Sequence, residues 1–589
     1  MILISKYENK LKLLFSICFL LLLSIFNANC YAVSLGQVDV GLIYGQNNQF
    51  PIGVTSTDGF GLYFNNSAGN QVIDFSAYSN LVFYKDGFFD SSRKLVESNE
   101  VYYSNNQVKG GYHLEIGQGY ETYESAIAVI ASIQAITEQA FLVYDDQWRV
   151  FQGAYLKESD ANVALSQVKA ALNGYKVTVA LPNDARVIVG TKDAILFAYD
   201  SRENEFVFKT TVFTLNDVKY RNSFLIKRLS NSDFTFINRV TMPEYLYGVL
   251  PKEASESWPI EALKAQAVAS KNFALTIGSK YAAYGFDVDA TVNSQVYGGY
   301  SVEKPRCNQA VDETDGYALA YQGTLIPMYF HSSSGGITDN SENVWSGTLP
   351  YIRSTTDFYS LGAPNTDWSA KINKSEIEAK LIQAGYNVGS LTQVKILSRA
   401  ESGRVLEFEF IGNLGKATVA KDKIRSVLGA SVIKSTLFSF DPDTAVTDVA
   451  AIKAGAANQD SSTTKPINLG ENGAMPKLAI NVAPTYGVLL DSELSYYQSG
   501  AVTNKKVDKN ALMASDDIYQ TNSQINKPYL YNSTESFDIT DGYVVFYGHG
   551  YGHGLGMSQW GAKAMADLGF DYEAILKYYY KDTELIQLH

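Results

Sequence analysis

Residues 242–275 read MPEYLYGVLPKEASESWPIEALKAQAVASKNFAL, and this stretch decides how the chain is interpreted. Thr241 precedes the stretch and Glu244 follows three positions later, which is the pattern of a helix-capping box. Pro243 between them suits the first turn of a helix, where a missing N–H costs nothing. We therefore expect a helix to begin at this point.

A second helix is expected after a short polar loop. Pro251 and the polar residues 253–257 interrupt the first helix. Pro259 then opens the second helix over residues 261–273, where strong helix formers carry an apolar stripe.

Three carboxylates lie in or beside this loop, at Glu253, Glu256 and Glu261. A carboxylate near a helix end and beside Trp258 is either solvated, or its pKa is shifted by its surroundings. Spacing alone favours a surface position for all three, so a catalytic role needs a further argument.

The whole stretch resembles the signature of the SpoIID/LytB family, which comprises lytic transglycosylases of the stage II sporulation protein D type and related amidase enhancers. Further segments agree with that family in the same order. They are NSQVYGG at 293–299, YFHSSSGGIT at 329–338 followed by ENVW to Trp345, and GHGYGHGLGMSQWGAKAMADLGFDYEAILKYYY at 548–580. The resemblance covers residues 184–440 and 541–589 and implies a mixed α/β catalytic domain.

The resemblance implies that Glu253 is the catalytic acid of a peptidoglycan lytic transglycosylase, because the family's acid lies four residues after a Gly-Val pair. Glu256 and Glu261 do not occupy that position. Hydrolytic glycosidases normally use two carboxylates, whereas a lytic transglycosylase needs one, since the substrate's own C6 hydroxyl attacks. Glu253 would first protonate the leaving N-acetylglucosamine oxygen and then deprotonate the C6 hydroxyl, leaving 1,6-anhydro-N-acetylmuramyl ends. This role needs a raised Glu253 pKa, through burial against neighbours such as Trp258.

Other polar residues of the signature segments are candidates for substrate binding. They are Gln266, Lys271, Gln295, Tyr297, His331, Ser334, His549 and His553. A structural hydrogen bond is the alternative for each. The family's Ala-Arg-Thr-Tyr is altered here to residues 270–273, Ser-Lys-Asn-Phe, so the bidentate guanidinium is lost and substrate contacts should weaken.

Glycine alternates with other residues from Gly548 to Gly556. If this segment is extended, all its side chains lie on one face and bare backbone lies on the other. Glycines at alternate positions argue against a helix, and therefore against a metal pair formed by His549 and His553. We expect these imidazoles to bind substrate or to orient the loop. The next helix should begin at Gln559 with Trp560 in the core.

Neither a metal nor a cofactor is expected. Some members of the resembled family are thought to bind zinc through His and Cys residues near the QVY motif, where this chain has Asn293 and Ser294. His331 and Cys307 would supply two ligands at most, too few for a closed zinc site.

Residues 112–181 contain a near-repeat of strand, helix and strand. The strands are expected at 113–117, 141–144, 148–153 and 176–181, and the helices near 126–139 and 161–172. This order predicts one four-stranded sheet with both helices on one face. The layout resembles the SPOR domain, most clearly in WRVFQGAYLKESDANVALSQVKAAL at 148–172. The resemblance implies that residues 110–183 bind glycan strands without stem peptides, and an unrelated ferredoxin-like module is the alternative.

The first 32 residues have the organisation of a signal peptide. Three lysines precede an apolar run at 13–26, and cleavage is expected near Ala32. An uncleaved membrane anchor and lipidation of Cys30 are the alternatives. Cleavage would leave Cys307 as the only cysteine and exclude an intrachain disulfide. We therefore expect a secreted or cell-envelope protein.

Two further regions contain no recognisable functional motif. Residues 33–108 alternate apolar and polar positions between turns, which predicts a β-rich segment. Residues 441–540 predict an insertion in the catalytic domain, a linker with a small accessory element around KLAINVAPTYGVLLDSELSYY at 477–497.

The composition fits this organisation. The 589 residues carry a net charge of −13 and are 46% hydrophobic, which favours a folded multidomain protein and disfavours a nucleic-acid partner. We expect an α+β multidomain lytic transglycosylase whose partner is the glycan strand of peptidoglycan. A non-catalytic enhancer of a partner amidase is the alternative, and a glycan-binding scaffold with a decayed active site is a third interpretation. The sequence does not indicate the oligomeric state.

Overall fold

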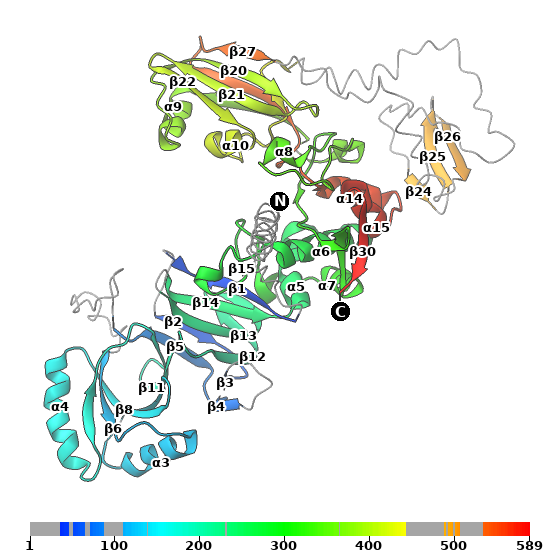
Figure 1. Ribbon diagram of the computed structural model, residues 1–589. Coiled ribbons are helices and arrows are strands. Elements are labelled where there is room, and N and C mark those ends of the chain that lie inside the picture. Colours follow the sequence, from blue (N-terminus) through cyan, green and yellow to red (C-terminus); the bar gives the residue numbers. More distant parts are fainter. Residues whose placement is uncertain are drawn as a thin grey trace, which may run out of the picture. The chain divides into compact units, whose positions relative to one another are not determined.

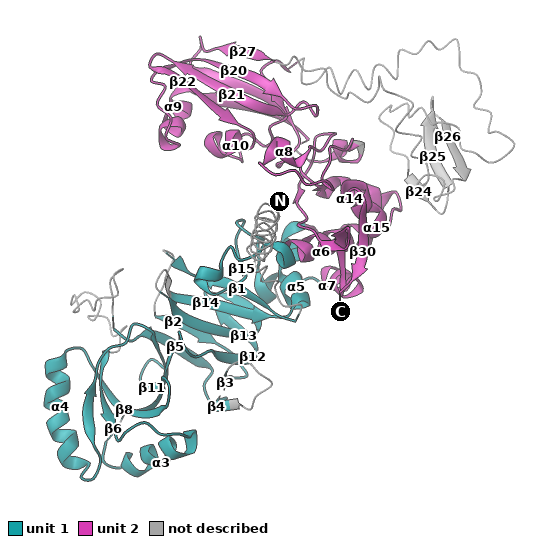
Figure 2. Ribbon diagram, in the orientation of Figure 1, with its two compact units in different colours: residues 1–253, 274–304 teal, residues 254–273, 305–589 magenta. Residues whose placement is uncertain are grey.

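The computed structural model describes most of the chain. The described residues are 36–45, 51–64, 71–87, 110–137, 139–229, 232–364, 366–442, 488–490, 493–498, 501–506 and 534–588. The predicted signal peptide lies outside them. Within the described residues, no helix combines the length and apolar character needed to cross a bilayer. Figure 2 shows two compact units: unit 1 comprises residues 1–253 and 274–304, and unit 2 comprises residues 254–273 and 305–589.

Unit 1 is built on one long mixed sheet (Figure 1). β1 (Val38–Ile43) pairs antiparallel with β14 (Ser232–Val240) and parallel with β15 (Val288–Asp289). β13 (Val218–Leu229) and β12 (Phe206–Leu215) continue the sheet from β14 as antiparallel neighbours. The β-rich N-terminal segment therefore shares a sheet with strands that follow residue 184, and the predicted domain boundaries stay a prediction.

Aromatic side chains fill the centre of this sheet. Its other strands are β2 (Ile52–Thr55), β3 (Phe60–Phe64), β4 (Gln71–Phe75), β5 (Asn80–Lys85), β10 (Arg186–Gly190) and β11 (Ile195–Asp200). The Phe224 ring stacks on Phe208 at a centroid distance of 5.1 Å and meets Phe83 edge-on at 5.6 Å. Alternating aromatic and β-branched residues fit a pleated, half-buried surface, which is why these segments form strands.

The near-repeat forms the predicted series of elements. They are β6 (Tyr112–Ile116), α3 (Tyr123–Ile133), β7 (Ala140–Tyr144), β8 (Trp148–Tyr155), α4 (Glu158–Ala171) and β9 (Val177–Ala180). The strands lie in the order β7-β8-β6-β9, α3 packs on β7 and β8, and α4 packs mainly on β6 and β9. These four strands are neighbours within the long sheet of unit 1, because the edge strand β7 also pairs with β11. Membership of the SPOR family stays a prediction.

The two helices of the deciding stretch are present. In the capping box, the Thr241 N–H donates to Glu244 Oε2 at 2.9 Å, and the Glu244 N–H donates to Thr241 Oγ1 at 3.4 Å. α5 (Met242–Glu253) includes Pro251 and ends at Glu253, the first residue of the polar stretch that was expected to interrupt it. Proline removes one backbone donor and crowds the carbonyl four residues earlier, and the helix ends two residues after Pro251. α6 (Ile260–Thr276) begins after Pro259, as expected.

Unit 2 contains several small sheets, and the C-terminal segment completes most of them. The pairs are β16 (Tyr317–Tyr321) with β30 (Thr583–Gln587), β18 (Phe330–His331) with β29 (Met557–Ser558), β19 (Asp367–Asn373) with β28 (Tyr543–His549), and β20 (Leu391–Arg399) with β27 (Glu535–Asp538). The segments on either side of the insertion are therefore neighbours. This arrangement agrees with the prediction that the segments before and after the insertion belong to the same domain. The predicted α+β multidomain class is confirmed.

The other elements of unit 2 are short. They are α7 (Pro305–Glu313), β17 (Thr324–Leu325), α8 (Ser341–Val344), α9 (Lys374–Gln383), β21 (Val405–Gly412), β22 (Gly415–Ala420), α10 (Lys423–Leu428), β23 (Phe438–Ser439), α14 (Gln559–Asp567) and α15 (Tyr572–Tyr579). Within the insertion, a three-stranded antiparallel sheet of β24 (Val488–Leu490), β25 (Glu493–Gln498) and β26 (Ala501–Lys506) overlaps the expected accessory element.

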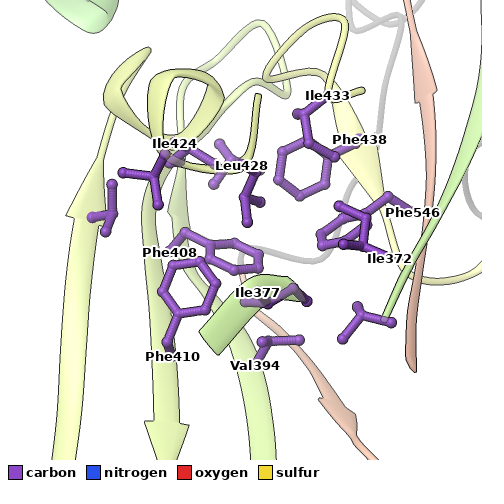
Figure 3. Close-up of a cluster of buried hydrophobic side chains, with 14 of the residues drawn as sticks. Ile372, Ile377, Val394, Phe408, Phe410, Ile424, Leu428, Ile433, Phe438 and Phe546 are labelled. Atoms are coloured by element: carbon purple, nitrogen blue, oxygen red, sulfur yellow. The ribbon is translucent and has the colours of Figure 1, made fainter. Parts of the chain in front are cut away.

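One apolar core of unit 2 gathers side chains from β19 to β23, β28, α9 and α10 (Figure 3). Phe408 lies at its centre, with ring centroids 4.9 Å from Phe410, 5.8 Å from Phe438 and 6.1 Å from Phe546. All four rings are fully buried. Since Phe546 comes from β28, this core forms only when the C-terminal segment has returned.

The glycine-rich segment after β28 is not extended, which corrects the expectation for Gly548–Gly556. Its last four glycines have positive φ, with values of 74° at 550, 123° at 552, 82° at 554 and 65° at 556. A Cβ at Gly550 would lie 2.7 Å from both Gly335 N and Ser333 O. The backbone therefore turns at each glycine and packs directly on the turn at residues 333–335, which requires left-handed geometry and no side chain.

Gly550→Ala should destabilise unit 2 by about 2–4 kcal/mol, because the left-handed backbone and the contact with residues 333–335 both oppose a methyl group. The matched control is Gly347→Ala, where a Cβ would meet nothing within 4 Å and the change should stay within about 0.5 kcal/mol. Urea unfolding of the full chain measures both. Equal midpoints for the two variants would contradict the described packing.

Candidate functional site

The candidate residues fall in both units. In unit 1, Glu253 is the last residue of α5 and is half-buried. Tyr245 lies two turns earlier on the same helix, and its side chain is fully buried. Burial raises the pKa of the Tyr245 hydroxyl, and the charges of Glu253 and Asp289 raise it further. A neutral phenol is therefore held within electrostatic range of the Glu253 carboxyl.

Two of the predicted binding residues surround Tyr245. Its hydroxyl donates to Gln295 Oε1 at 3.2 Å, and its ring stacks on Tyr297 at a centroid distance of 5.5 Å. The Tyr297 hydroxyl donates to Asn238 Oδ1 at 2.8 Å, and both Gln295 and Tyr297 are buried. A Cβ at Gly248 would lie 2.4 Å from the Tyr297 ring, which explains the glycine of the Gly-Val pair. Gln295 and Tyr297 thus support the helix that carries Glu253.

A second carboxylate, Asp289, is fully buried near this group. Its Oδ2 accepts hydrogen bonds from the Tyr44 hydroxyl at 3.0 Å and from Thr291 Oγ1 at 2.6 Å. Ser294 Oγ accepts from the Asp289 N–H, and the Asn293 carbonyl accepts from Lys280 Nζ. Asp289 is therefore an internal anchor for the loop before the QVY motif.

In the part of the chain that the structure describes, no three His, Cys, Asp or Glu side chains come together as metal ligands would. Cys307 is buried on α7.

In unit 2, Ser334 belongs to a buried hydroxyl network around Asp357. Ser334 Oγ donates to Asp357 Oδ2 at 2.7 Å and lies 2.8 Å from Ser360 Oγ. The Tyr579 hydroxyl donates to Asp357 Oδ1 at 2.9 Å. Burial raises the pKa of Asp357 to about 6, while its hydroxyl donors act in the opposite direction. Ser334 has no exposed surface, and the geometry therefore favours a structural role for it.

The sequence-predicted residues His331 and His553 form an imidazole pair, with ring centroids 5.6 Å apart. The Leu555 peptide joins them: its N–H donates to His553 Nδ1 at 3.0 Å, and its carbonyl lies 3.1 Å from His331 Nδ1, which must carry the proton. Burial lowers the pKa of His331 well below its usual value, and His553 and Arg404 add to this effect. Loss of hydration lowers the pKa of His553 to about 4, against the opposing charge of Asp422. Both imidazoles are neutral near pH 7.

His549 lies apart from this pair, at the end of β28. Its Nδ1 is 2.7 Å from Asp367 Oδ1 on the neighbouring strand β19, and its ring is buried. Trp560 opens α14 and is half-buried against the buried Trp258, with ring centroids 5.2 Å apart.

The polar residues of α6 make hydrogen bonds within unit 2, to which residues 260–273 of the helix belong. Gln266 Nε2 donates to Ser270 Oγ at 3.2 Å, and Gln266 Oε1 accepts from Gln559 Nε2 at 3.4 Å. Lys271 Nζ donates to the carbonyls of Thr314 at 2.5 Å and Tyr317 at 3.2 Å, and burial lowers its pKa to about 8. Lys271 is 2% exposed, so its ammonium joins the helix to the β16 region. Substrate binding by these two residues stays a prediction that the geometry does not favour.

Comparisons with known proteins agree with the motifs. The family described as "Stage II sporulation protein" (SpoIID) matches residues 230–321, and a domain of unknown function (DUF8618) matches residues 351–455. The amidase enhancer of Bacillus subtilis (strain 168) is 30% identical over 340 residues, which are 58% of this chain and 40% of the enhancer. Stage II sporulation protein D of the same organism is 25% identical over 279 residues, covering 45% of this chain and 74% of that protein. An uncharacterised protein of Brachyspira hyodysenteriae is 28% identical over 377 residues, or 64% of this chain and 74% of that protein.

The chain carries a domain of the SpoIID/LytB family. This confirms the family resemblance of the deciding stretch, since the matched residues 230–321 include α5, Glu253 and the QVY segment. The SpoIID domain match ends before the SSGG and GHG motifs. The chain spans 40% of the length of the amidase enhancer.

Several residues of these clusters were missed from the sequence. Tyr245 and Trp345 lie inside the quoted SpoIID segments, where their aromatic character was the available signal. Asp357 and Arg404 lie outside every motif. Arg404 is buried and its Nη2 donates to the Ser334 carbonyl at 2.7 Å, so these two residues support the SSGG turn from positions that carry no pattern.

Acidification should lower the stability of unit 2 through its imidazole pair. A histidine whose folded pKa lies below its unfolded value of 6.5 stabilises the fold above pH 6.5, and for His553 this contribution is lost as the pH falls to about 4. Asp357 has the opposite sign, because its raised pKa stabilises the fold below its unfolded value of 3.8, and that contribution is lost as the pH rises through about 6.

Urea unfolding in steps from pH 7 to pH 4 separates these two contributions. His553→Gln should lose less stability than the natural chain over this range, and Asp357→Asn should lose more. Parallel stability curves for the three proteins would contradict the assignment.

Proposed function

We propose that this chain is a peptidoglycan lytic transglycosylase that cleaves the MurNAc–GlcNAc bond of strands without stem peptides and leaves 1,6-anhydro-MurNAc ends. The observation that carries the proposal is the place of Glu253. The family resemblance assigns the catalytic acid to Glu253, which lies within the matched SpoIID region and is the last residue of α5. Glu253 is half-buried, and its charge contributes to the raised pKa of the buried Tyr245 hydroxyl.

Glu253 lies at the C-terminal end of α5, where the backbone carbonyls carry partial negative charge, and the proposed role requires its protonated form. Protonated Glu253 gives its proton to the leaving GlcNAc oxygen as the glycosidic bond breaks. The resulting carboxylate takes the proton of the MurNAc C6 hydroxyl while that oxygen bonds to C1, which restores the acid.

The burial and hydrogen bonds of Asp289 agree with a mechanism that uses a single carboxylate. A hydrolase would need a second carboxylate to activate water or attack the sugar. Asp289 is fully buried, and its Oδ2 already accepts two hydroxyl hydrogen bonds. It therefore serves the loop, and the tethered C6 hydroxyl replaces a positioned water.

The same chain would act in the cell envelope. The SpoIID relatives, one of them named an amidase enhancer, support a role connected with the cell wall. We propose that an N-acetylmuramoyl-L-alanine amidase removes stem peptides and so supplies the substrate. The SPOR-like module in β6 to β9 would hold the same stripped strands.

A second function has a specific observation in its favour. The similarity to the B. subtilis amidase enhancer extends over 340 residues, which suggests a wall-binding protein that increases the activity of an amidase without cutting glycan itself. In that case Glu253 would be dispensable for the effect.

Glu253→Gln should lower product formation by a factor of about 10² to 10⁴, because glutamine cannot exchange a proton. The substrate is peptidoglycan treated with an amidase, and mass spectrometry measures the soluble 1,6-anhydro disaccharides. Glu256→Gln is the matched control, since this exposed carboxylate lies three residues away and should be dispensable.

Equal product from Glu253→Gln and Glu256→Gln would contradict the assignment of the acid. Absence of product from the natural chain, together with stimulation of an added amidase by both variants, would replace the enzyme with the enhancer.

A further inference from the structure

An open cavity of about 400 Å³ lies in unit 2 between residues 344–346 and the start of α10. The ENVW segment, which ends at Trp345, forms one wall together with Ser346. The other wall is the start of α10, which belongs to the domain of unknown function. It contributes Lys421, Asp422, Lys423 and Ser426. The cavity combines a half-buried indole, hydroxyl groups and cations.

The indole is held in a fixed position. The Trp345 ring meets Tyr329 edge-on at a centroid distance of 4.4 Å and lies 5.3 Å from the His553 ring. Lys421 Nζ donates to the carbonyls of Glu342 at 2.6 Å and Trp345 at 2.9 Å. Lys421 also has a φ of 54°, a left-handed conformation that non-glycine residues rarely adopt. The lysine that opens the α10 wall therefore fixes the backbone that carries Trp345.

The rim of the cavity is positively charged, in contrast to the net charge of −13 of the chain. Arg425 Nη1 binds Asp422 Oδ1 at 3.0 Å, which balances that carboxylate. Lys421 and Lys423 remain as the cationic side chains of the cavity wall. Lys421 is engaged with backbone carbonyls, whereas Lys423 is exposed and lies 5.4 Å from the Tyr386 ring centroid. Lys423 is thus the cation that a bound anion can approach.

We propose that this cavity binds a sugar ring that carries a carboxylate. The C–H groups of a pyranose face pack on the negative face of the Trp345 indole, and the sugar hydroxyls pair with Ser346 and Ser426. The ammonium of Lys423 forms a charge-assisted hydrogen bond with the carboxylate.

The identity of the sugar rests on the proposed function. In peptidoglycan it is N-acetylmuramic acid, whose lactyl carboxylate is free only after the stem peptide has been removed, because the peptide is attached to it as a neutral amide. The cavity then gives the chain a means of distinguishing stripped strands from peptide-bearing ones.

The test measures binding to the full chain carrying Glu253→Gln, so that the ligand is not consumed. The first probe is a tetrasaccharide of alternating GlcNAc and MurNAc with free lactyl carboxylates, and the second is the same tetrasaccharide with these groups converted to methyl amides. Lys423→Gln should weaken binding of the free acid about tenfold and leave binding of the amide unchanged. Trp345→Leu should weaken binding of both.

Lys416→Gln is the matched control, because this lysine on β22 removes the same charge from a side chain that is 70% exposed and outside the cavity. It should bind both probes like the parent. Lys423 is exposed, so its result decides the proposal even if Trp345→Leu lowers stability. Equal binding by the Lys423 and Lys416 variants, or no binding of either probe to the parent, would overturn the proposal.

The experiments distinguish failure of the sugar-binding proposal from failure of the proposed function. Anhydro products that depend on Glu253, together with equal binding by the two lysine variants, would leave the enzyme in place without this subsite. Selective loss of acid binding in the Lys423 variant, with no products from the natural chain, would leave a wall-binding protein that recognises stripped strands.

Discussion

The return of the C-terminal segment is the constraint on which unit 2 depends. Residues 535–587 supply β27, β28, β29 and β30, and each strand completes a different sheet. The same segment places Phe546 in the core around Phe408 and sets the bare backbone of Gly550 on the turn at residues 333–335. Hydrogen bonding, burial and close backbone contact therefore all require one stretch of chain to be in place.

The clusters of polar residues follow from this return. His331 and His553 are far apart in sequence, and the Leu555 peptide joins their rings only because β29 pairs with β18. In unit 1 the equivalent support is α5, which carries Glu253 at its end and the buried Tyr245 near its start. Tyr297 and Gln295 pack behind that helix because Gly248 leaves room for an aromatic ring. Most of the other candidate residues make hydrogen bonds within the fold, and Glu253 is the residue proposed for the chemistry.

Local signals in the sequence predicted individual helices and strands. They did not predict which distant segments those elements pack against. The capping box at Thr241 and Glu244 fixes the start of α5, because both hydrogen bonds are made within four residues. Gly550 shows the limit: alternation suggested an extended strand, whereas left-handed turns arise from contact with a segment more than 200 residues earlier. The edge pairing of β7 with β11 and the burial of Lys271 are equally non-local. Asp357 and Arg404 belong to no motif, so only the folded chain shows their role.

The central claim is that one carboxylate, Glu253, works with the substrate's own C6 hydroxyl and needs no water. Digestion of amidase-treated peptidoglycan in water enriched in oxygen-18 tests this directly. The account predicts 1,6-anhydro products without the heavy isotope, because the new C1–O bond is made with an oxygen already in the sugar. Reducing ends that carry oxygen-18 would contradict it, since they require attack by water and hence a second catalytic group.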